Sequence, residues 1–131
     1  MLRAGPPSGA LAQSALPVAA ASLVELSELN APSDAQIAII AETYRLLGDP
    51  TRLRVLLACH AAPIAVGDIA KTVNGSPSLV SHHLRLLRAA RIVKAERQGK
   101  QVFYSAADAH ISTLLANMFE HIAETPNGID P

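Results

Sequence analysis

Apolar positions recur every three or four residues along most of the chain and alternate with polar ones in a single segment. After Ser33 this spacing predicts an amphipathic helix that ends at Gly48, and a second helix runs from Pro50 to a stop before Pro63. Two shorter helices follow from Val66, and a long one reaches about Glu124. Residues 93–104 alternate instead, which predicts a β-hairpin.

Two kinds of signal mark where these helices begin. In a capping box, a Ser and an acidic or amide residue three positions later each cap a backbone N–H of the other. A cap residue followed by Pro places the ring at the first helical position, where the missing N–H costs nothing. The predicted capping boxes are Ser33–Gln36 and Ser105–Asp108, and the cap–proline pairs are Asp49–Pro50 and Ser76–Pro77.

Residues 66–104 hold two short helices, a tight turn and the hairpin in succession. Asn74-Gly75 breaks the first helix, and the hairpin turns at Gln98-Gly99. On the second helix the predicted core side is Leu79, Leu84, Leu86 and Leu87, and the other side is Ser78, Ser81, His82 and Arg85. A helix–turn–helix followed by a basic hairpin is a winged helix. The predicted fold class is therefore mainly α with a small β-hairpin wing.

Positive charge is concentrated in the same region. Seven basic and two acidic residues between Val66 and Ser105 give this segment a net charge of +5, although the whole chain has a formal net charge of zero. DNA binding needs local positive charge facing phosphates and does not need a basic protein. The alternative is a solvated basic face on an ordinary domain, and the turn, caps and wing favour DNA binding over it.

Composition limits the remaining possibilities. The 131 residues amount to one domain, and because aromatic residues are only 3%, the core must be built from Leu, Ile, Val and Ala. Cys59 is the one cysteine, so we expect no intramolecular disulfide and a reducing, cytoplasmic location. No apolar run is long enough to span a membrane, and prolines and polar residues argue against a signal peptide. The predicted organisation is a disordered arm (1–20), a domain (21–125) and a tail (126–131).

The last helix combines an apolar stripe with ligand-type side chains. The stripe, at helical spacing from Ile111 to Ile122, is wide for a terminal helix and predicts packing against a second copy. His110 and His121 are 11 residues apart, so they share a face but lie about 16 Å apart along the axis and cannot reach one ion. Two antiparallel copies would bring Asp108 and His110 of one helix to His121 and Glu124 of the other.

Such a set of two imidazoles and two carboxylates suits Zn²⁺, with Co²⁺ as its tetrahedral substitute. The spacing leaves alternatives open. Asp108 could be only a capping carboxylate, Glu124 a solvated helix end, and the histidines packing residues at an interface. His82, in turn, could contact a phosphate or cap a helix and not read a base.

Several separated motifs, in order, resemble the ArsR/SmtB family of bacterial metal-responsive repressors. They are GDPTRLR (48–54), VGDIA (66–70), SLVSHHL (78–84), RQG (97–99) and FY (103–104), within a resemblance over about residues 35–125. The resemblance implies a dimer that binds operator DNA without metal and releases it when Zn²⁺ binds across the C-terminal helices. It places Asp108, His110, His121 and Glu124 at the metal, Ser78, Ser81, His82 and Arg85 in the major groove, and Arg97, Gln98 and Lys100 at flanking DNA.

One departure from the family limits the choice of metal. Other members carry cysteines at the position of Ala65, and none occurs here, so the thiolate site of arsenic, cadmium and lead sensors is absent. A regulator that responds to Cys59 oxidation or to an organic ligand remains the main alternative. A zinc hydrolase is disfavoured because four ligands leave no open position and no nucleophile motif occurs, so we expect no enzyme activity. A purely structural dimerisation module would leave the basic wing without a purpose.

Overall fold

The computed structural model describes residues 31–124. The predicted arm (1–20) and tail (126–131) lie outside these residues, so the domain boundaries at 21 and 125 stay predictions. The chain divides after Ile40 into two units. Helix α3 (Asp34–Leu47) begins in the first unit, and every later element belongs to the second.

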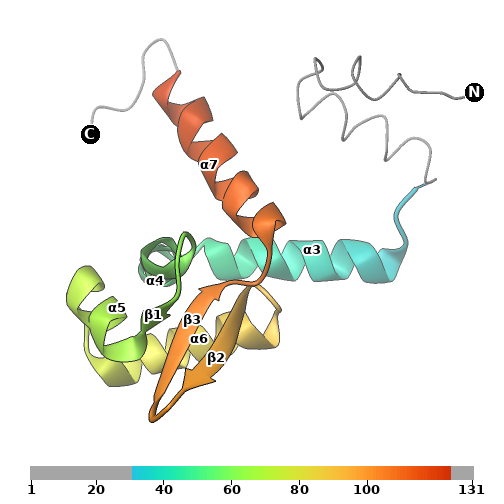
Figure 1. Ribbon diagram of the computed structural model, residues 1–131. Coiled ribbons are helices and arrows are strands. Elements are labelled where there is room, and N and C mark those ends of the chain that lie inside the picture. The colour runs from blue at the N-terminus through green and yellow to red at the C-terminus, as the bar shows by residue number, and fades with distance from the viewer. Residues whose placement is uncertain (1–30, 125–131) are drawn as a thin grey trace, which may run out of the picture. The chain divides into compact units, whose positions relative to one another are not determined.

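The second unit is a group of helices with a hairpin beside them (Figure 1). Its elements are α4 (Pro50–Cys59), β1 (Ile64–Ala65), α5 (Val66–Val73), α6 (Pro77–Ala89), β2 (Val93–Gln98), β3 (Gln101–Ala106) and α7 (Ala109–Ala123). The predicted mainly helical winged fold is confirmed. None of the helices within residues 31–124 has the length and apolarity needed to cross a membrane.

Three of the four predicted helix starts are confirmed. The backbone N–H of Gln36 donates to Ser33 Oγ at 3.1 Å, and the Ser33 N–H donates to Gln36 Oε1 at 2.9 Å. Asp49 and Ser76 accept from the backbone N–H three residues on, at 2.8 and 3.1 Å, each ahead of a proline at the start of its helix. These hydrogen bonds satisfy N–H groups that have no partner inside a helix.

The predicted capping box at Ser105–Asp108 is wrong. Ser105 lies within β3, and Asp108 is itself the N-cap of α7, in an extended conformation. Its Oδ1 accepts from the backbone N–H of His110 at 2.9 Å and of Ile111 at 3.3 Å. Strand pairing wins over the local signal here, because Ser105 pairs with Lys94 in the hairpin.

The turn between α5 and α6 forms at Asn74-Gly75, as predicted. Asn74 is the C-cap of α5 and takes the left-handed conformation, at φ 56° and ψ 47°. The N–H of Asn74 bonds to the carbonyl of Lys71, and that of Gly75 to the carbonyl of Ala70. Asn tolerates this conformation better than other residues with a side chain, so α5 stops sharply and α6 begins shortly after Asn74.

The sheet has one strand more than the sequence predicted. β1 pairs antiparallel with β3, in the order β1-β3-β2, and its two residues are too few to show alternation. The hairpin turn is centred one residue later than predicted, on Gly99 and Lys100, because Gln98 pairs with Gln101. Gly99 has φ +65°, the sign that a two-residue hairpin turn needs at its first position.

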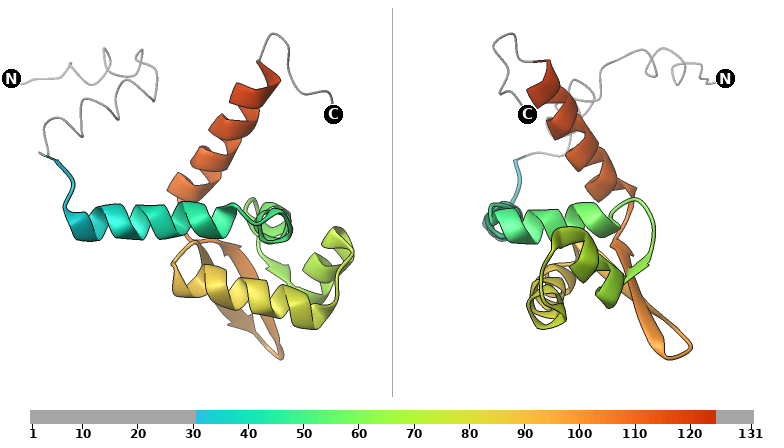
Figure 2. Two further views of the ribbon diagram at one scale, coloured as in Figure 1. Left: turned by 180° about the vertical axis from the view of Figure 1, so that it is seen from behind. Right: turned by 90° about the vertical axis from the view of Figure 1, so that its left-hand side faces the viewer.

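The core lies where α4, α5 and α6 meet, with α6 alongside the hairpin in both views of Figure 2. Leu84 and Leu87 of α6 are fully buried, as predicted, and Leu86 packs against the core. The prediction for Leu79 is wrong, since 44% of this residue is exposed. Val80 and His83 fill buried positions that the sequence pattern did not assign to the core.

Candidate functional site

Helix α6 presents a polar face opposite its buried residues. Ser78, His82 and Arg85 are exposed and Ser81 is half-buried. At about 100° per residue, Ser78, His82 and Arg85 lie within one narrow stripe. The Ser76 cap defines the start of this helix, and Ser78 and His82 are exposed in its first turns.

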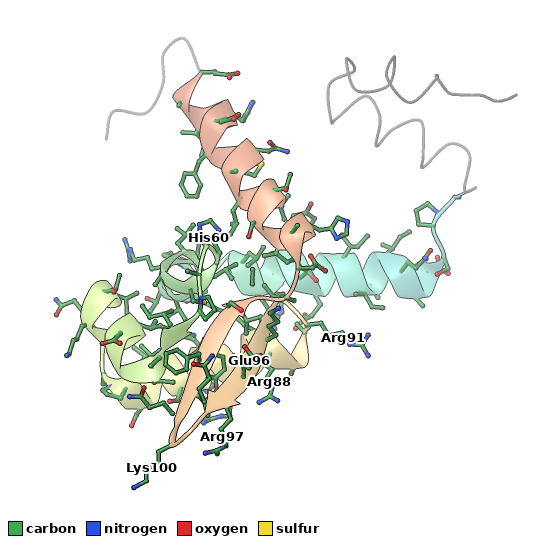
Figure 3. All side chains as sticks on the ribbon, viewed as in Figure 1. His60, Arg88, Arg91, Glu96, Arg97 and Lys100 are labelled. Atoms are coloured by element: carbon green, nitrogen blue, oxygen red, sulfur yellow. The ribbon has the colours of Figure 1, made fainter. Side chains whose placement is uncertain are left out.

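The hairpin forms the second part of the face. Arg97, Gln98 and Lys100 are all exposed at its tip. Figure 3 shows the Arg97 and Lys100 side chains projecting outward from the strands. The register Arg97↔Val102 and Gln98↔Gln101 keeps the two strands paired up to the turn, so the charges stand on an ordered ribbon.

Two further arginines extend this basic surface, and the sequence pattern identified them only as charge. Arg88 and Arg91 are exposed at the end of α6 and in the turn that follows, and Figure 3 shows both projecting outward. Arg91 has φ 61°, a left-handed conformation that usually requires glycine. Its N–H bonds to the carbonyl of Arg88 and that of Ile92 to the carbonyl of Leu87, which closes α6.

We expect substitution of Arg91 by Gly to raise stability and weaken DNA binding. Glycine removes the steric cost of the left-handed conformation, so the free energy of unfolding should rise by about 1 kcal/mol in chemical denaturation. Removal of the charge should lower DNA affinity and reduce the slope of log affinity against log salt by about 0.9 for each phosphate that is no longer neutralised. Arg91→Lys is the matched control and should keep the salt slope. An unchanged slope in the glycine variant would show that Arg91 contacts no phosphate.

One polar residue of α6, His83, is buried on the side of the helix away from its exposed face. His83 is 6% exposed, and its Nδ1 has no hydrogen-bond partner among the described residues. Burial, together with the charge of Arg52, lowers the pKa of His83, although Asp49 opposes the shift. Asp49 itself has a lowered pKa because its carboxylate accepts from the Arg52 backbone N–H. His83 therefore serves as a neutral packing residue, and the exposed histidine of the pair is His82.

Helix α7 carries an apolar face that the other residues of the described part, 31–124, leave largely uncovered. Only Leu115 is buried, whereas Met118, Phe119 and Ile122 are 50%, 48% and 41% exposed. These side chains line a cavity of about 330 Å³ together with Tyr44, Leu47, Gly48, Leu53, Leu114 and Leu115. An apolar surface of this kind marks an interaction site.

The four predicted metal ligands occupy the two ends of α7. Asp108 and His110 come together at its start, with Asp108 Oδ1 3.3 Å from His110 Nδ1, and the two side chains are 57% and 95% exposed. Because Asp108 precedes the helix in an extended conformation, its side chain reaches His110, which two residues inside a helix would not allow. His121 and Glu124 are exposed at the other end. Within residues 31–124 of one chain, no three ligand-type side chains gather.

Cys59 lies in the core and not at the surface. It is fully buried at the end of α4, and burial raises the pKa of its thiol to about 11. The thiolate is the reactive form in oxidation, so this cysteine is poorly suited to a redox switch in the folded protein.

The fold and the exposed basic face define a winged helix–turn–helix DNA-binding protein. Residues 47–96 match a helix-turn-helix domain family. The transcriptional repressor SmtB homolog of Synechocystis is 41% identical over 86 residues, which span 66% of this chain and 65% of that protein. The transcriptional regulator NmtR of Mycobacterium tuberculosis is 37% identical over 93 residues, which span 70% of this chain and 78% of NmtR.

Solved structures agree with the sequence matches. The solution structure of apo-NmtR has a TM-score of 0.63 and 34% identity, covering 77% of this chain and 86% of that one. A homodimeric winged helix-turn-helix domain from Mycobacterium bovis reaches a TM-score of 0.67 at 23% identity, covers 78% of this chain and 97% of that one, and supports the fold. The chain therefore belongs to the ArsR/SmtB family of metal-responsive winged-helix transcriptional regulators.

Proposed function

We propose that this protein is a homodimeric repressor that binds operator DNA in the metal-free state and releases it when Zn²⁺ binds. Co²⁺ would act as a substitute for Zn²⁺. The observation that carries the proposal is the arrangement of α7. One helix has two pairs of side chains of the kind that bind metals at its opposite ends, and between them an apolar face that the described residues leave exposed.

The DNA-binding part rests on the exposed face of α6 and the wing. Ser78, Ser81, His82 and Arg85 would enter the major groove, because the first turns of a second helix–turn–helix helix contact base edges. Arg97, Gln98 and Lys100 would contact the flanking DNA, and Arg88 and Arg91 would add phosphate contacts. Contacts to phosphates position the protein on DNA but carry no information about the base sequence. The operator sequence must therefore be recognised by the residues of α6.

The metal part rests on the donor set. Asp108, His110, His121 and Glu124 offer two imidazoles and two carboxylates, and all four are exposed, so a second chain can reach them. Two α7 helices packed antiparallel along their apolar faces would place the first pair of each beside the second pair of the other. When bound, Zn²⁺ supplies a tetrahedral link among nitrogen and oxygen ligands. Each dimer would have two equivalent sites.

The link between metal and DNA is thermodynamic coupling. If Zn²⁺ binds the DNA-free conformation more tightly than the DNA-bound one, reciprocity requires that it lower DNA affinity. The α7 helices join the two copies, and each copy carries one α6. A small change in the crossing of the α7 helices would alter the distance between the two α6 helices. The spacing of half-sites on DNA fixes that distance, so affinity falls.

The test is fluorescence anisotropy of the full-length protein on DNA, at fixed ionic strength, with and without Zn²⁺. The probe is a labelled duplex taken from a random-sequence pool by selection with the metal-free protein. We expect tight binding that saturating Zn²⁺ weakens between about 5-fold and 150-fold. If one sequence is enriched but Zn²⁺ does not change its affinity, the protein is a DNA-binding regulator and the proposal that it senses zinc is wrong. Failure to enrich any sequence would contradict the proposal as a whole.

A further inference from the structure

One exposed apolar residue lies away from the proposed dimer surface. The large apolar side chains that are exposed among the described residues belong to α3 and α7, with Leu79 of α6 as the single exception. Leu79 is 44% exposed and does not line the cavity beside α7. Dimerisation through α7 therefore does not account for it.

Leu79 sits in the first turn of α6, next to the capped end of the helix. Its backbone N–H donates to the Ser76 cap at 3.1 Å. The side chain lies on the flank of the polar face, about 60° round the helix from His82 at about 3.6 residues per turn. Ser78 and His82, both exposed, are its neighbours on that face. A leucine in this position lies in the part of the helix that faces the major groove in the proposed function.

We propose that Leu79 reads the C5-methyl group of thymine in the operator. This inference rests on the proposed function, because it requires that α6 enter the major groove. The thymine methyl is the one apolar group that base pairs display there, and apolar side chains recognise it by contact. Ser, His and Arg side chains on the same face can hydrogen-bond to base edges or phosphates but cannot replace this contact. Leu79 would thus add a preference for A·T pairs at one position of each half-site.

The experiment compares two forms of one duplex, the sequence selected by the metal-free protein. One form is synthesised with dT and the other with dU throughout, a change that removes only the C5-methyl groups. We expect the wild-type protein to bind the dU duplex about fourfold more weakly for each methyl group covered. Leu79→Ala should bind the dT duplex more weakly than the wild type, with little further weakening on dU. Circular dichroism checks that this exposed substitution leaves the fold intact.

A second variant separates methyl contact from general weakening. Arg97→Ala should lower affinity for both duplexes because it removes a charge from the wing, and its ratio of dT to dU affinity should equal that of the wild type. A wild-type protein that binds both duplexes equally would overturn the role of Leu79. So would a Leu79→Ala variant that keeps the wild-type ratio, because the ratio would then come from DNA shape. If no sequence is selected at all, the proposed function fails along with the inference.

Discussion

Substitution of Phe119 by Glu is expected to separate the proposed dimer into monomers and to abolish tight operator binding. Phe119 is 48% exposed in the middle of the apolar face of α7. In a two-fold dimer each substitution acts twice. Removal of about 2 kcal/mol of apolar burial on each side, with a carboxylate introduced into the interface, should raise the dimer dissociation constant at least about a hundredfold. Sedimentation velocity measures the change in assembly.

The matched control for this variant is Thr113→Glu. Thr113 is exposed on the same helix but lies off the apolar stripe, about 120° round the helix from Phe119. The Thr113→Glu variant adds the same charge as Phe119→Glu, and it should leave both the dimer and the DNA affinity close to wild type. A Phe119→Glu variant that stays dimeric would show that α7 does not form the dimer interface, and the two-chain metal site would fall with it.

Substitution of His121 by Ala should leave metal-free operator binding within about twofold of wild type and remove the effect of Zn²⁺. One imidazole of the proposed four ligands is removed, and the coupling of about 5-fold to 150-fold between metal and DNA should fall below about twofold. Glu124→Ala should behave in the same way. Anisotropy on the selected duplex gives the DNA affinity, and equilibrium competition with a chromophoric chelator gives the metal affinity.

Glu120→Ala is the control for these variants. Glu120 is an exposed carboxylate one helical turn before Glu124, and it belongs to neither proposed ligand pair. Its variant should keep the full response to Zn²⁺. If Glu120→Ala loses the response as completely as Glu124→Ala, the metal is held by a different set. If His121→Ala responds like the wild type, His121 is no ligand.

Much of the fold follows from local signals. The caps at Ser33, Asp49 and Ser76 form the hydrogen bonds that their sequence contexts predicted, since each needs only residues three positions apart. The alternation after Arg91 correctly predicted a hairpin. The errors occur where the pairing of strands far apart in the chain determines the local structure. Strand β1 forms because it pairs with β3. Ser105 pairs with Lys94 as part of β3 and therefore does not cap α7.

For the candidate site, too, some features follow from the sequence and others from the tertiary structure. Helical and hairpin periodicity correctly predicted which residues are exposed together on the polar face of α6 and at the tip of the wing. The roles of these residues at DNA, and of the two pairs on α7 at a metal, remain predictions. Burial was harder to predict. Leu79 is exposed and His83, on the same helix, is buried, and the packing of α6 against α4, α5 and β2 decides which side of the helix is covered. The structure also showed that Cys59 is fully buried in the core and that Asp108 is the N-cap of α7 itself, beside His110. Periodicity fixes which residues share a face, but what covers that face depends on contacts between segments far apart in the chain.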